Sequence, residues 1–269
     1  MRRVPRVLSI AGSDSGGGAG IQADLKAFAA CGVHGMTAIT AITAQNTVGV
    51  IAVEPVVPEM IVAQVRAVVD DIGVDAVKVG MLGTVATVEA VEAALELLPE
   101  RTPVVIDPVM VAESGAELLD PAARGALIAR LLPRATVVTP NVPEAAALTG
   151  LRDADSETLA RAVLELGPRA VVVTGGHRAI ATDVFYDGRT LTELDGERYP
   201  DGAAHGSGCT HSSVLAARLA WGDTPLEAAR YAKRIAAAAV RDGLDQIGVG
   251  AGPVNVLGLG TARTTIGSD

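Results

Sequence analysis

The chain has 269 residues, enough for one large α/β domain, and 49% of them are hydrophobic, enough for a sizeable core. Its 31 acidic residues outnumber the 22 basic ones, and the net charge of −9 argues against nucleic-acid binding because an acidic surface repels phosphate backbones. No apolar stretch approaches the ~18 residues of a membrane span, and the two cysteines, Cys31 and Cys209, do not make a disulfide framework. We therefore expect a cytoplasmic protein without nucleic-acid or membrane partners, folded as a single domain over residues 1–269 with a glycine-rich tail from about residue 248.

Short runs rich in valine and isoleucine alternate along the chain with alanine-rich segments of helical spacing. The predicted strands are residues 7–11, 38–43, 76–79, 104–106, 136–138 and 170–173. The predicted helices are residues 19–30, 58–71, 85–98, 121–131, 156–166, 208–220 and 224–240. Strands that alternate with helices form right-handed βαβ units, so we expect a mainly parallel sheet covered by helices on both faces.

Residues 183–198 have a different pattern. Two short apolar segments flank Asp187-Gly188, a pair of residues typical of a tight hairpin turn. This pattern predicts a small β-hairpin beside the parallel sheet.

A glycine cluster at residues 12–20 follows the first predicted strand. Such a loop brings backbone N–H groups close to a ligand and directs a helix N-terminus at it. It matches neither the Walker A pattern nor the dinucleotide G-x-G-x-x-G pattern, and a simple strand-to-helix turn is the alternative interpretation. By helical period alone, Gln22 and Asp24 in the next helix are expected to face solvent.

Ligands of open parallel sheets bind beyond the carboxyl ends of the strands, so the residues that follow strands are candidates for the site. After the second strand, the carboxamide of Gln45 offers a donor and an acceptor that suit an aminopyrimidine edge, although a plain turn residue explains it as well. After the third strand, Met81 is either a core residue or the wall of a ring pocket.

Two further strand ends carry carboxylates. Asp107 lies in Asp-Pro-Val-Met (107–110) and Glu144 in Asn-Val-Pro-Glu (141–144). Acidic residues at neighbouring strand ends can hold Mg²⁺, which takes few protein carboxylates and keeps its waters. Helix capping is the competing role for each.

The segment His-Gly-Ser-Gly-Cys-Thr (205–210) opens the next-to-last helix. Small residues at a helix start expose N–H groups that stabilise the charge of a transferring phosphoryl group. Cys209 lies in the first turn, where the positive helix end favours a thiolate, so it is a candidate base for a substrate hydroxyl. An inert cysteine is the alternative.

As a set, these segments resemble the hydroxymethylpyrimidine/phosphomethylpyrimidine kinases of thiamine biosynthesis, in the ribokinase superfamily. The resemblance extends from about residue 4 to residue 257 and rests on residues 10–26, 43–47, 80–82, 107–110, 141–144 and 205–210. It implies a ribokinase-like three-layer α/β/α fold. It also implies two successive phosphoryl transfers from ATP, first to the hydroxymethyl oxygen and then to the monophosphate.

The same resemblance implies roles for individual residues. Gln45 would pair with the pyrimidine, in a substrate pocket with Gly12, Asp24, Met81 and Val109. Cys209 would be the base, and Gly206, Ser207 and Gly208 would complete an anion hole with it. Mg-ATP would be bound by Asp107, Asn141, Glu144, Thr174, Gly176 and His205, with Asp107 and Glu144 as the ligands of Mg²⁺. We also expect a homodimer.

The chain departs from the family pattern at four positions. Glu113, Thr174 and Ala251 stand where lysine, lysine and histidine are usual, and Ser207 mildly replaces a threonine. Weaker nucleotide binding, or compensation by an arginine such as Arg178, would follow if the missing groups touch phosphates. Two alternatives remain open: a pyridoxine or pyridoxal kinase of the same superfamily, and a sensor that binds the pyrimidine without transferring phosphate.

Overall fold

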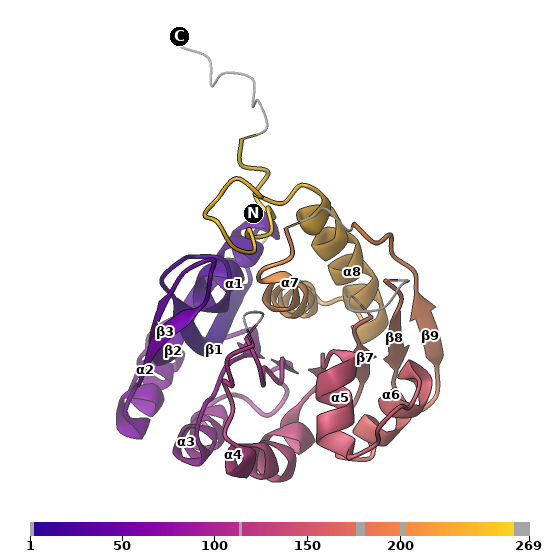
Figure 1. Ribbon diagram of the computed structural model, residues 1–269. Coiled ribbons are helices and arrows are strands. Elements are labelled where there is room, and N and C mark those ends of the chain that lie inside the picture. Colours follow the sequence, from indigo (N-terminus) through magenta and orange to yellow (C-terminus); the bar gives the residue numbers. More distant parts are fainter. Residues whose placement is uncertain (1–2, 113–114, 176–180, 200–202, 261–269) are drawn as a thin grey trace.

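The structure, a computed structural model, describes residues 3–112, 115–175, 181–199 and 203–260. Within them, all strands join one nine-stranded sheet in the order β3-β2-β1-β4-β5-β6-β7-β8-β9 (Figure 1). The strands are β1 (Arg6–Asp14), β2 (His34–Gln45), β3 (Val50–Pro55), β4 (Ala76–Val79), β5 (Val104–Ile106), β6 (Val137–Val138), β7 (Val171–Val173), β8 (Asp183–Tyr186) and β9 (Leu191–Leu194). The pairings from β2 to β7 are parallel, and β3, β8 and β9 add antiparallel strands at the two edges. The predicted mainly parallel sheet is confirmed.

Helices cover both faces of this sheet. On one face lie α1 (Gly20–Ala30), α7 (Ser207–Trp221) and α8 (Pro225–Arg241); on the other lie α2 (Pro58–Asp71), α3 (Val85–Leu95), α4 (Pro121–Ala126), α5 (Val142–Thr149) and α6 (Ser156–Leu164). Successive strand residues alternate between the two layers: Val7 packs with the α1, α7 and α8 side, and Leu8 with the opposite side. Because both faces are buried, the inner strands are mostly apolar, which is the pattern of a three-layer fold; Ser9 in β1 and Lys78 in β4 are buried polar exceptions.

Two elements were absent from the sequence prediction. Every residue of β3 is at least partly exposed, so burial imposes no alternation on its sequence. Helix α5 is short, and its start was interpreted as a turn that carries an acid, with helix capping as the alternative. The structure shows a capping box there, in which Asn141 accepts from the backbone of Glu144 and Glu144 accepts from the backbone of Asn141.

Other predictions needed smaller corrections. The helix predicted at residues 121–131 is α-helical only to Ala126, and a π-helical segment, Leu127–Leu131, continues it. The predicted hairpin exists as β8 and β9, but it pairs with β7 and so extends the main sheet. At its turn, the Asp187 carboxylate accepts hydrogen bonds from the backbone of Arg189 and Thr190, and Gly188 has a positive φ of 86°.

In the part of the chain that the structure describes, no helix is long and apolar enough to cross a bilayer.

Candidate functional site

The loop after β1 and the start of α7 are packed directly against each other. A methyl group on Gly18 would collide with the His205 ring, and one on Gly206 would collide with the Gly18 carbonyl. Gly206 also has a φ of 82°, which disfavours any side chain there. The backbone N–H of Gly20 lies near the Cys209 thiol and acts to lower its pKa. The glycines therefore permit a close approach between two segments almost 190 residues apart in the sequence.

Asp14 organises the glycine-rich loop. Its carboxylate accepts hydrogen bonds from the backbone of Gly16 (2.8 Å), Gly18 (3.0 Å) and Ala19 (2.8 Å), and it lies 3.1 Å from His205 Nε2. Burial acts to raise the pKa of Asp14, but the hydrogen bonds from His205 and the loop backbone outweigh it and hold the pKa below its usual value. His205, predicted as a nucleotide residue, is thus a structural partner of the first loop.

Cys209 lies in the first turn of α7 as predicted, and its thiol has a raised pKa. Burial raises the pKa of Cys209 to about 12. The ammonium of Lys78 and the N–H of Gly20 lower the pKa, and the negative charges of Asp107 and Asp24 raise it further. Burial and the two carboxylates therefore oppose the thiolate that the helix start favours, and the role of Cys209 as a base stays a prediction.

The predicted anion hole is partly occupied by the protein itself. The backbone N–H of Ser207 donates to the carbonyl of Ala204 (2.9 Å) and is not free for a ligand. Within the described residues, the N–H groups of Gly208 and Cys209 have no backbone acceptor. First-turn amides of a helix lack intrahelical partners, so these two remain available for an anionic oxygen.

A buried ion pair that the sequence analysis missed lies beneath the site. Lys78 Nζ is 2.9 Å from Asp24 Oδ1 and 4.0 Å from Asp107 Oδ2, and neither Lys78 nor Asp24 has any exposed surface. Burial alone would lower the pKa of Lys78, but the charges of Asp24 and Asp107 and the other negative groups around it together outweigh burial, and the pKa is raised. The feature of the sequence that could have revealed this ion pair is a lysine within the otherwise apolar strand β4.

Asp24 therefore differs from both expectations for it. It does not face solvent, because β4, β1 and α7 surround it: it accepts hydrogen bonds from Lys78, from Ser9 Oγ (2.5 Å) and from Ser213 Oγ (2.7 Å). Because its carboxylate has no accessible surface, Asp24 contributes to the site in this structure by holding the Lys78 ammonium in place.

Asp107 and Glu144 lie at neighbouring strand ends. Asp107 accepts a hydrogen bond from Ser212 Oγ (3.0 Å), and Glu144 accepts from the backbone of Asn141 (2.9 Å) and of Met110 (3.4 Å). Burial raises the pKa of Asp107, and burial together with the charge of Asp107 raises the pKa of Glu144 to about 8. The described residues contain no cluster of three metal-ligating side chains. Two buried carboxylates with raised pKa values still suit Mg²⁺, which keeps most of its waters.

Gln45 lines a cavity of about 360 Å³ between the β2–β3 turn, His205 and the tail. The cavity residues are Gln45, Asn46, Thr47, Val48, Gly49, Ala112, His205, Val249, Gly250 and Ala251. Thr43 Oγ1 donates to the Gln45 side-chain oxygen (3.3 Å), and Ser15 Oγ donates to the Gln45 carbonyl (2.6 Å). The turn of Gln45 is thereby tied to the glycine-rich loop.

Three other residues were predicted to line the substrate pocket: Gly12, Met81 and Val109. A methyl group on Gly12 would lie 3.0 Å from Met81 Sδ, so these two residues are in contact. Met81 and Val109 are half-buried.

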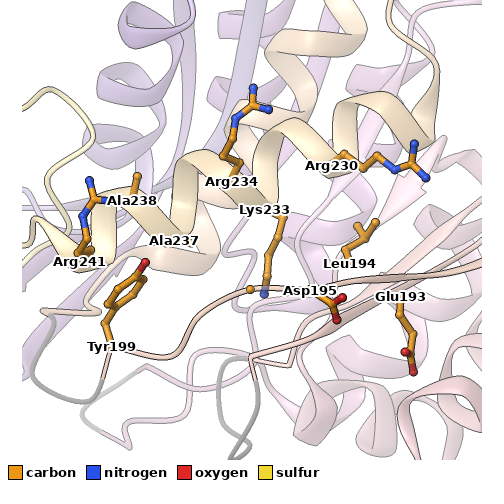
Figure 2. Close-up of a pocket in the computed structure, with 11 residues that line it drawn as sticks. Glu193, Leu194, Asp195, Tyr199, Arg230, Lys233, Arg234, Ala237, Ala238 and Arg241 are labelled. Carbon is orange, nitrogen blue, oxygen red and sulfur yellow. The ribbon is translucent and has the colours of Figure 1, made fainter.

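A second cavity, of about 510 Å³, was not anticipated from the sequence. It lies between α8 and the segment after β9 (Figure 2), and its lining residues are Glu193, Leu194, Asp195, Gly196, Tyr199, Arg230, Lys233, Arg234, Ala237, Ala238 and Arg241. This cavity has no local sequence signal, because Arg230, Arg234 and Arg241 are exposed helix residues, where charges are usual.

The remaining predicted nucleotide residues are placed as follows. Thr174 directly follows β7, its N–H donates to the Pro140 carbonyl (2.9 Å), and it pairs with Asn141. Gly176 lies outside the described residues, as do Glu113 and Arg178.

Comparisons with known proteins show the family of the chain. The sequence model of the family described as Phosphomethylpyrimidine kinase matches residues 14–255. A hydroxymethylpyrimidine/phosphomethylpyrimidine kinase of Rhizobium meliloti is 51% identical, covering 92% of this chain and 95% of the relative. One from Streptomyces coelicolor is 47% identical, covering 93% and 94%.

Solved structures have the same fold. A Bacillus subtilis pyridoxal kinase in complex with ADP superimposes with a TM-score of 0.85 at 40% identity, covering 94% of this chain and 97% of that one. A phosphomethylpyrimidine kinase from Clostridium difficile has a TM-score of 0.75 at 40% identity, covering 86% and 96%. The chain therefore belongs to the phosphomethylpyrimidine kinase family.

Proposed function

We propose that this protein uses ATP to phosphorylate the hydroxymethyl group of 4-amino-5-hydroxymethyl-2-methylpyrimidine, and then phosphorylates the monophosphate to the diphosphate, for thiamine biosynthesis. The observation that carries the proposal is the meeting of the glycine-rich loop, the turn of Gln45 and the start of α7 at one end of the sheet. The names of relatives at 51% and 47% identity support the same substrate.

The ring would bind between Gln45 and the contact of Gly12 with Met81. The Gln45 carboxamide would pair with the aminopyrimidine edge, and Met81 and Val109 would form the apolar walls. Gly12 allows close approach because a side chain there would press on the Met81 sulfur.

The amino end of α7 would stabilise the transferring phosphoryl group. The N–H groups of Gly208 and Cys209 would donate to its oxygens, and the helix dipole would add to the effect. Gly206 permits the packing that brings these amides into place. The N–H of Ser207 already donates to the carbonyl of Ala204, so we assign Ser207 a role in shaping the turn.

Cys209 would accept the proton of the substrate hydroxyl. Its raised pKa makes the thiolate scarce but strongly basic, and the Lys78 ammonium favours that thiolate. Little proton removal is needed early in a loose phosphoryl transfer, so a scarce thiolate is compatible with turnover. The second transfer needs no such base, because a phosphate monoester is ionised near neutral pH.

Mg-ATP would lie beside α7. Asp107 and Glu144 would hold Mg²⁺, which supplies positive charge to the phosphates. The 510 Å³ cavity would take the nucleoside portion, with Thr174 and Asn141 between it and the phosphates. Two hydrogen bonds to the Asp183 carboxylate support this placement. Lys233, which lines the cavity, donates one of them, and the backbone of Gly175, next to Thr174, donates the other.

A second candidate function is pyridoxal phosphorylation. It is favoured by the TM-score of 0.85 to a pyridoxal kinase, against 0.75 to a phosphomethylpyrimidine kinase. The deciding experiment measures turnover of hydroxymethylpyrimidine and pyridoxal side by side with Mg-ATP, and separates the monophosphate from the diphosphate. Formation of the pyrimidine diphosphate supports the proposal, and turnover of pyridoxal alone contradicts it.

We further propose that the protein works as a homodimer in the cytoplasm. The β2–β3 ribbon exposes large apolar side chains at a sheet edge: Ile42 is 56% exposed, Val48 63% and Ile51 77%. An exposed apolar edge strand invites pairing with another chain, and a second copy would cover it.

A further inference from the structure

Asp183, the first residue of β8, is a buried carboxylate that contacts three other parts of the fold. Its Oδ1 accepts hydrogen bonds from Lys233 Nζ on α8 (2.7 Å) and from the backbone N–H of Gly175 after β7 (2.9 Å). Its Oδ2 lies 3.7 Å from His211 Nε2 on α7. Asp183 is 2% exposed, so these neighbours, and not water, compensate its charge.

His211 lies beside the Asp183 carboxylate but does not neutralise its charge. The residue is 4% exposed, and its Nε2 makes no hydrogen bond within the described residues. Burial lowers the pKa of His211, so the ring is neutral at neutral pH and does not compete with Lys233 for the charge of Asp183.

Lys233 differs from the other cations of the 510 Å³ cavity. Figure 2 shows its side chain extending from α8 toward the segment that carries Asp195, whereas Arg234 extends to the other side of the helix. The Lys233 side chain is only 11% exposed, and its stem passes so close to Gly196 that any side chain there would collide with it. Lys233 is thus held at a fixed place in the cavity wall.

We propose that Asp183 is a positioning residue for nucleotide binding, which acts by holding the Lys233 ammonium in the wall of the nucleotide cavity and the backbone of Gly175 beside it. The inference rests on the proposed use of this cavity for the nucleoside portion of ATP. A lysine has four rotatable side-chain bonds, and an acceptor that fixes it before the ligand arrives removes the cost of ordering it on binding. The carboxylate therefore acts on the nucleotide through Lys233, without touching it.

The test measures binding of ADP by calorimetry, together with KM and kcat for both substrates. Asp183→Asn keeps an oxygen for the Gly175 N–H but removes the charge that orders Lys233. We expect it to weaken ADP binding and raise KM for ATP by roughly tenfold, the effect of about one ordered long side chain, with the KM for the pyrimidine unchanged. Lys233→Met should weaken ADP binding to the same extent, and Lys233→Arg, which can still pair with Asp183, should stay within about twofold of wild type.

The double variant decides whether Asp183 acts through Lys233. If it does, Asp183→Asn combined with Lys233→Met binds ADP no more weakly than Lys233→Met alone. Asp223→Asn is the matched control, because Asp223 pairs with Arg218 (2.7 Å) outside the cavity, and it should leave ADP binding unchanged.

Three outcomes overturn the inference: wild-type ADP affinity in Lys233→Met, wild-type affinity in Asp183→Asn, or additive losses in the double variant. The first result decides even if Asp183→Asn fails to fold. A wild-type protein that binds ADP but does not phosphorylate hydroxymethylpyrimidine refutes the proposed function and leaves the positioning role testable by ADP binding alone.

Discussion

The buried pair of Lys78 and Asp24 gives the sharpest stability prediction. Replacing Lys78 by methionine keeps an apolar stem of similar length but leaves Asp24 as a buried carboxylate without its counter-ion, since neither residue has exposed surface. Removing one partner of a buried ion pair costs about 3–5 kcal/mol. We therefore expect Lys78→Met to lower the free energy of unfolding by about 4 kcal/mol, measured by urea denaturation.

The double variant, Lys78→Met with Asp24→Asn, separates the ion pair from packing. The asparagine oxygen can accept from one of the two serines, Ser9 or Ser213, and its NH2 group can donate to the hydroxyl of the other, while no net charge remains buried between the two positions. At least half of the lost stability should return. Arg6, which pairs with Asp75 at the partly exposed start of β1, provides the control: Arg6→Met should cost about 1 kcal/mol or less. The reasoning is refuted if Lys78→Met costs under about 1 kcal/mol, or if the double variant is as unstable as the sum of its two changes.

Three further predictions concern the reaction and the assembly. Cys209→Ala should slow the first phosphoryl transfer by about 10²-fold or more and the second far less, because only the hydroxyl needs a base; equal losses in separately assayed steps contradict that role. Mg²⁺ affinity should rise from pH 6 to 8 and level off above it, because the pKa of Glu144 is raised to about 8 and the metal must displace its proton at lower pH. A metal titration should show this slope in wild type and lose it in Glu144→Gln, and an unchanged slope in the variant would exclude Glu144 as its source. Ile51→Lys, at a position 77% exposed on the edge strand, should yield monomers in sedimentation experiments with the unfolding transition unchanged; a dimer that persists would place the interface elsewhere.

Local sequence was informative wherever burial or turn chemistry acts on neighbouring residues. The inner strands were predictable because both of their faces are buried, which makes them continuous apolar runs. The turn at Asp187-Gly188 was predictable because the turn itself needs an acceptor and a positive φ. In contrast, β3 was missed because none of its residues is buried, so its sequence carries no alternation.

For the site, the sequence determined which chemical groups stand at strand ends and at the start of α7, since parallel strands place their carboxyl ends together. It did not determine their ionisation. The pKa of the Cys209 thiol is raised because the thiol is desolvated and two carboxylates from distant segments lie near it.

The sequence by itself determined most of the strands and helices, the parallel sheet and the small residues that let the first loop pack on α7, because these follow from periodicity and from local steric limits. Only the tertiary structure decided that Asp24 lies buried against Lys78, that Asp183 holds Lys233, and that Glu144 has a pKa of about 8. Each of these depends on charges brought together from distant parts of the chain, and on the exclusion of water around them, which no local pattern encodes.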